Sequence, residues 1–221
     1  MSEIEAIYAH RFSPAERAQK DALWRTLCRH FFQRYVRPDD VVLDLGAGFC
    51  EFINHIACRQ RIAVDLSDET ARCAAAGVAV YRDLSAVADA SVDLVFCSNF
   101  FEHLPDKRAM AATLDAIVRV LRAGGRLMIL QPNIKYLTTQ YWDFFDHHIP
   151  LSHLSMVEAL VGHGLAPAVV IPRFLPFTTK SSLPKADILV RAYLRFPPAW
   201  RVLGRQMFIL AEKRPRGAER P

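Results

Sequence analysis

The 221-residue chain lacks several features that mark membrane proteins and metalloproteins. No run of about 18 apolar residues is present, so no segment is expected to cross a membrane. The five cysteines are scattered without a C-x-x-C pair, which argues against a zinc ribbon or a dithiol redox centre. The first residues resemble neither a signal peptide nor a transit sequence. We therefore expect a cytoplasmic protein with reduced, mostly buried thiols and no metal site.

Over most of the chain, acidic and basic residues nearly balance, and the basic excess lies in the last part. From residue 172 onward there are eleven Lys and Arg against three acids, whereas the preceding residues are slightly acidic. The basic part includes an insertion at 173–204 in which aromatic rings and prolines alternate with cations. Such a segment suits an acidic substrate or the anionic inner face of a membrane. A solvated basic surface over a hydrophobic core is an equally good interpretation.

The length and the 52% hydrophobic content fit one domain over residues 1–221. Ser13 and Pro14 begin a predicted helix at 13–36, whose apolar stripe ends near Pro38. Strands and helices then alternate, which is typical of a doubly wound parallel sheet. The expected strands are 41–46, 61–66, 78–83, 92–98, 126–131, 168–172 and 206–212, and the expected helices are 50–59, 68–76, 106–122 and a segment from Ser152 or Ser155 to Gly162.

The segment from Val41 to Phe52 is the strongest functional signal, because an apolar strand ends there at Asp44 and enters a Gly-x-Gly turn. Gly46 and Gly48 allow a tight bend and the close approach of a ligand to the main chain. A purely structural turn would look similar. The dinucleotide fingerprint requires a third glycine at the position of Glu51, whose charge opposes a pyrophosphate. A nicotinamide cofactor is therefore disfavoured, and a cationic cofactor without phosphate fits better.

Asp44-Leu-Gly-Ala-Gly48 resembles motif I of the class I S-adenosylmethionine (SAM) methyltransferases. Four later segments resemble further motifs of the type 11 small-molecule branch in the same order: Ile62–Ser67, Val78–Asp83, Val92–Asp106 and Val120–Leu130. The resemblance implies a Rossmann-like, doubly wound, seven-stranded α/β sheet that is mostly parallel, with an antiparallel last strand beside the fifth. One departure is Cys50, at a position where the family often has another glycine.

The resemblance also implies SAM as cofactor and S-adenosyl-L-homocysteine as product. In the family, the acid matching Asp65 holds the ribose hydroxyls, and the one matching Asp83 meets the adenine; a carboxylate can accept both ribose donors at once. His103 lies under the cofactor edge by the same comparison, although a helix-capping role would also explain it. The implied cofactor-binding residues are Asp44, Gly46, Ala47, Gly48, Asp65, Leu66, Asp83, Leu84, Ser98, Asn99 and His103.

Three loop segments are candidates for the remaining contacts, because ligands of such sheets lie past the carboxyl ends of the strands. Arg11, in the first segment, could bind the cofactor carboxylate or could be a solvated arginine. The second segment supplies candidate substrate contacts at Tyr136, Tyr141 and Trp142, and candidate bases at Asp143, His147 and His148. Alternatively, its rings cap the core and its histidines bond at the surface. The third segment is the basic insertion.

We therefore expect methyl transfer, most simply to oxygen, on a small-molecule or lipid-linked saccharide acceptor. Nucleic acid is not the expected partner, because Ser98-Asn99-Phe100-Phe101 lacks the Asn-Pro-Pro-aromatic pattern of enzymes that methylate base amines. The alternative is a catalytically silent methyltransferase-like subunit that binds a partner protein or a membrane through the basic insertion. The sequence makes no prediction of oligomeric state.

Overall fold

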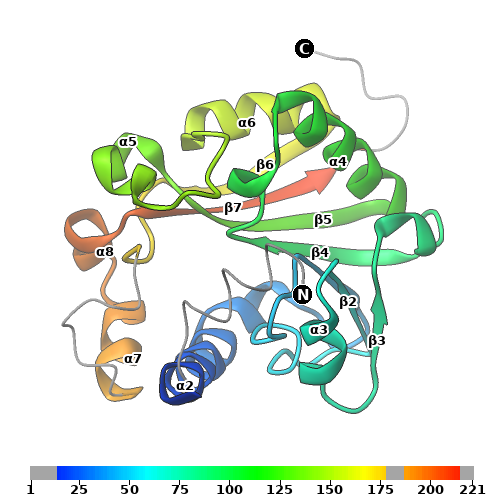
Figure 1. Cartoon of the computed structure of the whole chain (residues 1–221), viewed down its shortest axis with the longest axis horizontal. Helices are drawn as coiled ribbons and strands as arrows, with labels where there is room; N and C mark the ends of the chain where they lie inside the picture. Colours follow the sequence, from blue (N-terminus) through cyan, green and yellow to red (C-terminus); the bar gives the residue numbers. More distant parts are fainter. Residues whose placement is uncertain (1–13, 178–186, 215–221) are drawn as a thin grey trace.

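The computed structural model describes residues 14–177 and 187–214, which form one seven-stranded sheet between layers of helices (Figure 1). The strand order is β3-β2-β1-β4-β5-β7-β6. The strands are β1 (Val41–Leu45), β2 (Gln60–Val64), β3 (Val78–Tyr81), β4 (Val92–Ser98), β5 (Leu121–Pro132), β6 (Leu165–Ile171) and β7 (Gln206–Lys213).

Strands β1 to β5 pair in parallel, whereas β7 is antiparallel to both β5 and β6. This confirms the expected Rossmann-like, mostly parallel sheet and the insertion of an antiparallel last strand beside the fifth. In the central register, Asp44 of β1 lies between Ala63 of β2 and Phe96 of β4. The carboxyl ends of β1, β2 and β4 consequently meet at one edge of the sheet, where ligands of doubly wound folds bind.

Helices cover both faces of the sheet. The N-terminal helix predicted at 13–36 is shorter in the structure, where α2 (Pro14–His30) is followed by the separate 3-10 turn η1 (Phe32–Tyr35). Each of three further helices has a side-chain cap at its N-terminus, which satisfies an otherwise unpaired backbone N–H. These helices and their caps are α3 (Asp68–Cys73) with Ser67, α4 (Lys107–Val120) with Asp106, and α6 (His153–Gly162) with a capping box of Ser152 and Ser155.

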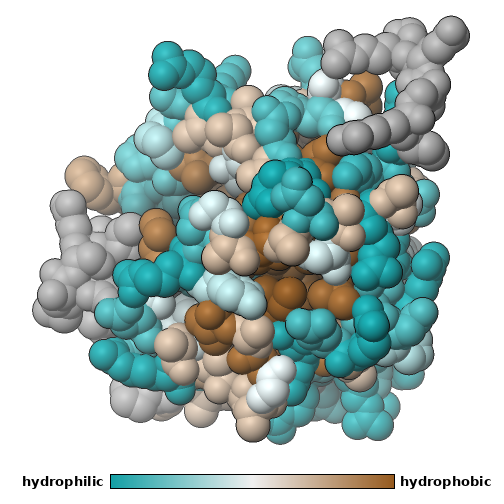
Figure 2. All heavy atoms as spheres, turned by 90° about the vertical axis from the view of Figure 1, so that its right-hand side faces the viewer, coloured by the Kyte–Doolittle hydropathy of each residue, from teal (hydrophilic) through white to brown (hydrophobic). Residues whose placement is uncertain are grey.

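The two faces of the sheet carry different cores. Aliphatic side chains fill the layer under α4 and α6, whereas most of the buried aromatic rings lie in the layer under α2. Within the aromatic layer, the rings of Phe31 and Phe174 stack with centroids 4.1 Å apart. Phe174 belongs to the basic insertion, so at least this part of the insertion is core. On the side of the molecule where β3 and α4 lie, hydrophilic residues surround a central apolar group (Figure 2).

Most of the rest of the described insertion forms α7 (Asp187–Arg195), which lies next to α2, and α8 (Pro197–Leu203), which follows α7 towards β7 (Figure 1). Thr26 of α2 donates a hydrogen bond to Asp187, with the oxygens 2.5 Å apart. Leu194 of α7 is buried in the aromatic core. The insertion therefore extends the helical layer on the α2 face. No helix in the described ranges is long and apolar enough to cross a bilayer.

The helix predicted at 50–59 is wrong, because the chain forms a series of turns there. Cys50 has a backbone φ of +62°, in the left-handed region, which interrupts a right-handed helix at its first residue. The backbone N–H of Asn54 still bonds to the Cys50 carbonyl at 3.0 Å, but the ladder does not continue. Phe52, Ile53 and Ile56 are nevertheless buried, so the apolar spacing reported their burial and not their secondary structure.

Candidate cofactor and acceptor site

The glycine turn after β1 bends as the sequence predicts. Gly46 has φ of +73° and Gly48 of +51°, and the N–H of Gly46 bonds to the Val64 carbonyl of β2 at 2.9 Å. A Cβ on Gly46 would lie 2.5 Å from the ring of Phe100, whereas a Cβ on Gly48 would meet no atom within 4 Å. Gly46 is therefore required by both conformation and packing, and the side of Gly48 faces open space.

Asp65 lies directly against this turn. Its Oδ2 accepts the N–H of Gly48 at 2.8 Å, and its Oδ1 accepts the N–H of Ser67 at 2.8 Å. Each carboxylate oxygen has two lone pairs, so one acceptor position remains on each oxygen. The neighbouring Leu66 is 67% exposed. The structure thus connects the ends of β1 and β2 through a fixed, half-buried carboxylate that can accept two more donors.

Asp44 is buried beneath the same turn. Burial raises the pKa of its carboxyl group well above 3.8, and the nearby acids Glu51 and Asp65 raise this pKa further, while a hydrogen bond from the Ile53 N–H opposes the change. Glu51 is held 2.9 Å from the ammonium group of Lys20. A cationic ligand in this place would favour the ionised form of these acids.

The other predicted cofactor residues line nearby strand ends in different environments. Asp83 is exposed and caps the 3-10 turn η2 (Leu84–Ala86), where the N–H of Ser85 bonds to its Oδ1 at 2.7 Å and lowers the pKa of its carboxyl group. Leu84 and Ala47 are buried. Asn99 follows Ser98 at the end of β4 with φ of +48°. Arg11 lies outside the described residues.

Glu102 is a buried acid just beyond β4, in the 3-10 turn η3 (Phe101–His103). Its Oε2 accepts a hydrogen bond from Gln131 Nε2 at 2.6 Å, whereas its Oε1 has no hydrogen-bond partner in the described part of the chain. Burial raises the pKa of this carboxyl group. The backbone N–H of His148 donates to the Glu102 carbonyl at 2.7 Å. This bond fastens the aromatic loop onto η3.

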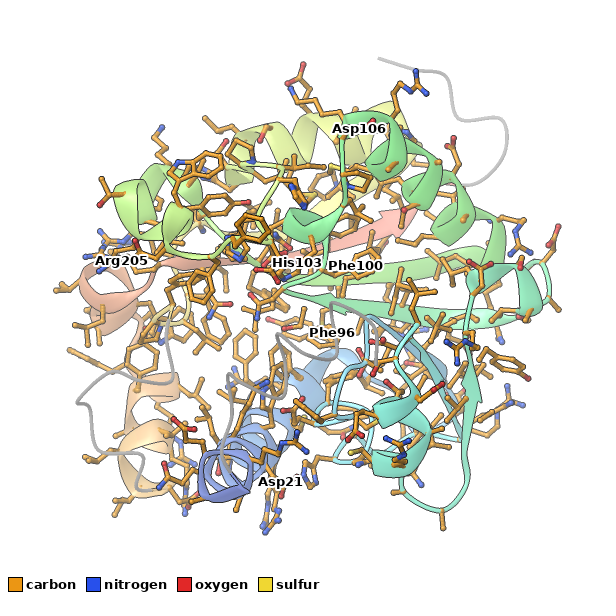
Figure 3. All side chains as sticks on the ribbon, in the orientation of Figure 1. Asp21, Phe96, Phe100, His103, Asp106 and Arg205 are labelled. Atoms are coloured by element: carbon orange, nitrogen blue, oxygen red, sulfur yellow. The ribbon has the colours of Figure 1, made fainter. Side chains whose placement is uncertain are left out.

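The same loop brings His147 to His103, with ring centroids 5.1 Å apart. His103 Nδ1 lies 3.0 Å from the Asp146 carbonyl oxygen and 3.2 Å from Asp146 Oδ2, and His147 Nδ1 lies 2.9 Å from the Tyr141 carbonyl oxygen. Figure 3 shows His103 beside Phe100 at the end of β4. The structure thus gathers Glu102, His103 and His147, each with one metal-ligating atom within 4.8 Å of the others.

Sequence reasoning missed this group, since it predicted no metal site and left Glu102 out of the site residues. His103 and His147 are separated by more than 40 positions, so no short spacing motif connects them. The only signal available was that a carboxylate and imidazoles occurred in two segments that should both follow parallel strands.

The remaining residues predicted to contact the methyl acceptor differ in whether they are buried or exposed. Tyr141 is fully buried and its hydroxyl donates to the Ile149 carbonyl, so it supports the loop from inside. Trp142 is 57% exposed, and Asp143 and His148 are also exposed. Tyr136 lies on the short helix α5 (Ile134–Leu137), with the Arg173 guanidinium 5.0 Å from its ring centroid. The alternative that Trp142, Phe144 and Phe145 cap the core does not fit Trp142 or Phe145, because both are exposed.

Three buried side-chain oxygens of the described residues have no hydrogen-bond partner: Glu102 Oε1, Gln131 Oε1 and Gln206 Oε1. Pro132 at the end of β5 pairs with Gln206 at the start of β7, so both amides lie at the carboxyl edge of the parallel strands. Their Nε2 groups are already committed, to Glu102 and to the Pro176 carbonyl respectively. The unsatisfied groups are all acceptors, which favours a ligand that donates hydrogen bonds or carries positive charge.

The comparisons with known proteins concern the fold and the central part of the chain. A family model described as "Methyltransferase domain" matches residues 43–129, the part of the chain that contains the glycine turn, Asp65, Asp83 and η3. No curated protein matches the chain significantly. The fold is therefore Rossmann-like, and residues 43–129 match the family model of a methyltransferase domain.

Solved structures show the same fold. A chain of the complex between the Haloferax volcanii Trm112 methyltransferase activator and its methyltransferase has a TM-score of 0.67 at 19% identity, covering 92% of this chain and 94% of that one. A SAM-dependent methyltransferase from Archaeoglobus fulgidus has a TM-score of 0.64 at 18% identity, covering 88% and 94%. Geranyl diphosphate C-methyltransferase from Streptomyces coelicolor, solved with Mg²⁺, geranyl diphosphate and S-adenosyl-L-homocysteine, has a TM-score of 0.61 at 17% identity, covering 90% and 80%.

Proposed function

We propose that this SAM-dependent methyltransferase transfers its methyl group to a hydroxyl oxygen of a small-molecule or lipid-linked saccharide. The observation that carries the cofactor part is the contact between Asp65 and the Gly48 N–H, because it fixes a carboxylate beside the one open glycine of the turn. That carboxylate retains an acceptor position on each oxygen for the two ribose hydroxyls. In this proposal, Asp83 and Leu84 lie at the adenine, and Ser98, Asn99 and His103 border the donor.

The negative environment of Asp44 and Glu51 supports a sulfonium donor over a phosphate-bearing one. Burial has already raised the pKa of the Asp44 carboxyl group, which shows how unfavourable a further negative charge would be there. A cation reverses this penalty, since it favours the ionised form of each nearby acid. The same argument makes a nicotinamide dinucleotide a poor ligand for the turn.

The unsatisfied oxygens of Glu102, Gln131 and Gln206 support a hydroxyl-bearing acceptor. Each can accept one hydrogen bond from a polyol, and leaving such groups unpaired in a buried site is costly. Trp142 is exposed and offers a ring face against which a sugar can pack, whereas the Tyr136 ring already contacts His153 and Arg173. The acceptor oxygen forms a bond to the methyl carbon, the carbon–sulfur bond breaks with its electron pair on sulfur, and the hydroxyl proton passes to a base among His147, His148 and Asp143.

Replacing Asp65 by Ala tests cofactor recognition. We expect SAM affinity, measured by isothermal titration calorimetry, to fall by at least about 100-fold, because two charge-assisted hydrogen bonds are lost. Asp68→Asn is the matched control, since Asp68 is exposed and pairs with Arg82. Circular dichroism checks that both variants are folded. Unchanged SAM affinity in folded Asp65→Ala would remove ribose recognition from the proposal.

The acceptor part is tested separately by S-adenosyl-L-homocysteine formation. Purified enzyme with SAM is supplied with saccharides, lipid-linked saccharides and matched analogues whose hydroxyls are already methylated. We expect turnover only with acceptors that carry a free hydroxyl. Turnover that persists with the blocked analogues would place the methyl group on another atom.

A catalytically silent, partner-binding subunit is the second candidate. The Haloferax volcanii structure contains a methyltransferase activator, and α7 and α8 of this chain expose Ile188, Phe196 and Val202. A silent subunit would form no S-adenosyl-L-homocysteine with any acceptor, either alone or with its partner. Turnover by the isolated chain would exclude this function.

A further inference from the structure

We propose that Glu102, His103 and His147 form a binding site for one divalent transition-metal ion of the zinc or ferrous class. Each side chain offers one ligand atom, and these atoms lie within 4.8 Å of one another. Two imidazoles and one carboxylate are a donor set of catalytic zinc sites and of non-haem iron sites. A bound ion would occupy Glu102 and His147, so the hydrogen bonds proposed for the acceptor would then fall to Gln131 and Gln206, and the role of base to His148 or Asp143.

The outer hydrogen bonds of both histidines fit this role. His103 Nδ1 bonds to the Asp146 carbonyl oxygen at 3.0 Å, and His147 Nδ1 bonds to the Tyr141 carbonyl oxygen at 2.9 Å. A carbonyl oxygen can only accept, so Nδ1 carries the proton in each ring and the lone pair lies on Nε2. Metal-binding histidines are typically held in this way, with one ring nitrogen donating to a backbone carbonyl or carboxylate.

Glu102 provides the independent observation that points to a ligand. It has no exposed surface, Gln131 occupies its Oε2, and its Oε1 has no partner among the described residues. A buried carboxylate oxygen without a donor is unfavourable, and a bound cation would satisfy it. His103 supplies the route of entry, because 27% of its side-chain surface is exposed while His147 and Glu102 are buried.

The ligand atoms would need only a small contraction to bind an ion. Metal–ligand distances of about 2.0–2.2 Å in a tetrahedral site require neighbouring ligand atoms about 3.3 Å apart. Separations of up to 4.8 Å therefore shorten by on the order of 1.5 Å, which rotations of three side chains can supply. Three protein ligands leave a coordination position open, as in catalytic rather than structural zinc sites.

The experiment uses the full chain with any affinity tag removed and with metals stripped by chelator. Zn²⁺ binding is measured by calorimetry, and Co²⁺ binding is measured by its visible absorption. We expect one ion per chain and a Co²⁺ spectrum typical of low coordination number. Removing a residue that only hydrogen-bonds to a metal ligand typically lowers metal affinity by about 10–100-fold. His147 and Glu102 are proposed as direct ligands, so we expect His147→Ala and Glu102→Gln to weaken binding by at least about 100-fold.

His163→Asn is the matched control, because His163 bonds within α6 and its removal takes one imidazole from the chain without touching the cluster. Its Zn²⁺ affinity should equal that of the unmodified chain. No binding at one equivalent, or equal affinity in His147→Ala, Glu102→Gln and His163→Asn, would overturn the site. Circular dichroism identifies the folded variants, and the nearly isosteric Glu102→Gln decides the result if His147→Ala does not fold.

SAM affinity is measured on the same samples without added metal. No metal binding by the unmodified chain, together with normal SAM affinity and turnover, would refute this inference alone. Stoichiometric metal binding with no SAM affinity would instead refute the proposed function.

Discussion

The polar groups at the amino ends of the parallel strands are paired, whereas several of those at the carboxyl ends are not. At the amino ends of the parallel strands, the buried Arg126 guanidinium lies 2.5 Å from Asp40 Oδ2 and 2.7 Å from the Tyr35 carbonyl oxygen. Arg122 pairs there with Asp93 at 2.7 Å, and Asp93 also accepts the Val41 N–H at 2.6 Å. These described charges are paired and fix the strands in place.

The carboxyl edge contains the opposite arrangement. Asp44 is buried among acids, and the oxygens of Glu102, Gln131 and Gln206 have no partner in the described ranges. Such groups lower stability unless a ligand satisfies them. One edge therefore contributes stability and the other retains unsatisfied groups for binding, which is the expected distribution when a rigid sheet supports a functional site.

The largest stability effect should come from the amino edge. Arg126→Ala leaves the buried Asp40 without its cation, and we expect the free energy of unfolding to fall by about 3–5 kcal/mol in urea titrations. SAM affinity of the folded fraction should not change. Arg25→Ala, which removes an exposed pair with Asp21, should cost no more than about 0.5 kcal/mol. A loss of SAM affinity in Arg126→Ala would show that the two edges are coupled.

Gly46→Ala should affect both stability and binding. Its Cβ would meet the Phe100 ring at 2.5 Å, so we expect a loss of about 2–3 kcal/mol in stability and at least a tenfold fall in SAM affinity. Gly164→Ala is the control, because φ is +76° but the surrounding space is open. It should cost about 1–2 kcal/mol and leave binding unchanged. If SAM affinity fell equally in Gly46→Ala and Gly164→Ala, general backbone strain, and not the loss of space beside Phe100, would explain the weaker binding.

Asp44→Asn should stabilise the apo protein while weakening its affinity for SAM. Burial raises the folded-state pKa of this carboxyl group above 3.8, so the folded protein holds its proton over a pH range where the unfolded chain has released it. Stability consequently falls as pH rises from about 4 towards the folded pKa. The amide removes that slope, so we expect Asp44→Asn to be more stable than the unmodified chain at pH 7.

Asp83→Asn provides the contrast in pH dependence. The pKa of the Asp83 carboxyl group is lowered by its hydrogen bonds to Ser85, so its contribution is present above about 4 and is lost as pH falls through the folded pKa. Urea titrations between pH 3 and 8 should give slopes of opposite sign for the two acids. Matching slopes would contradict the buried, acid-rich environment assigned to Asp44.

The smallest effect on stability should come from the acceptor loop. Trp142 is exposed, so Trp142→Ala should change the free energy of unfolding by less than about 0.5 kcal/mol. The loss of a ring face should raise the acceptor KM about tenfold, corresponding to an interaction of about 1.4 kcal/mol. Leu154→Ala, at an exposed position on α6, should leave KM unchanged. A normal KM in Trp142→Ala would place the acceptor elsewhere.

Local patterns predicted much of the fold. β4 spans Val92–Ser98 as expected, because an apolar run with flanking turn signals is a short-range property. The glycine turn and the acid at the tip of β2 were also readable, since a positive φ and a strand end are encoded in a few residues. The segment after Gly48 was not, because helical spacing of Phe52, Ile53 and Ile56 also arises when turns bury the same residues.

By itself, the sequence determined the alternation of strands and helices, the bend at Gly46 and Gly48, and the acids at the carboxyl ends of β1 and β2. These features depend on neighbouring residues and their backbone preferences. Only the tertiary structure decided that His147 points into the site while His148 is exposed, because the bond from the His148 N–H to the Glu102 carbonyl sets the loop. It also brought Glu102 and His147 together, since contacts between distant residues depend on how the whole chain packs.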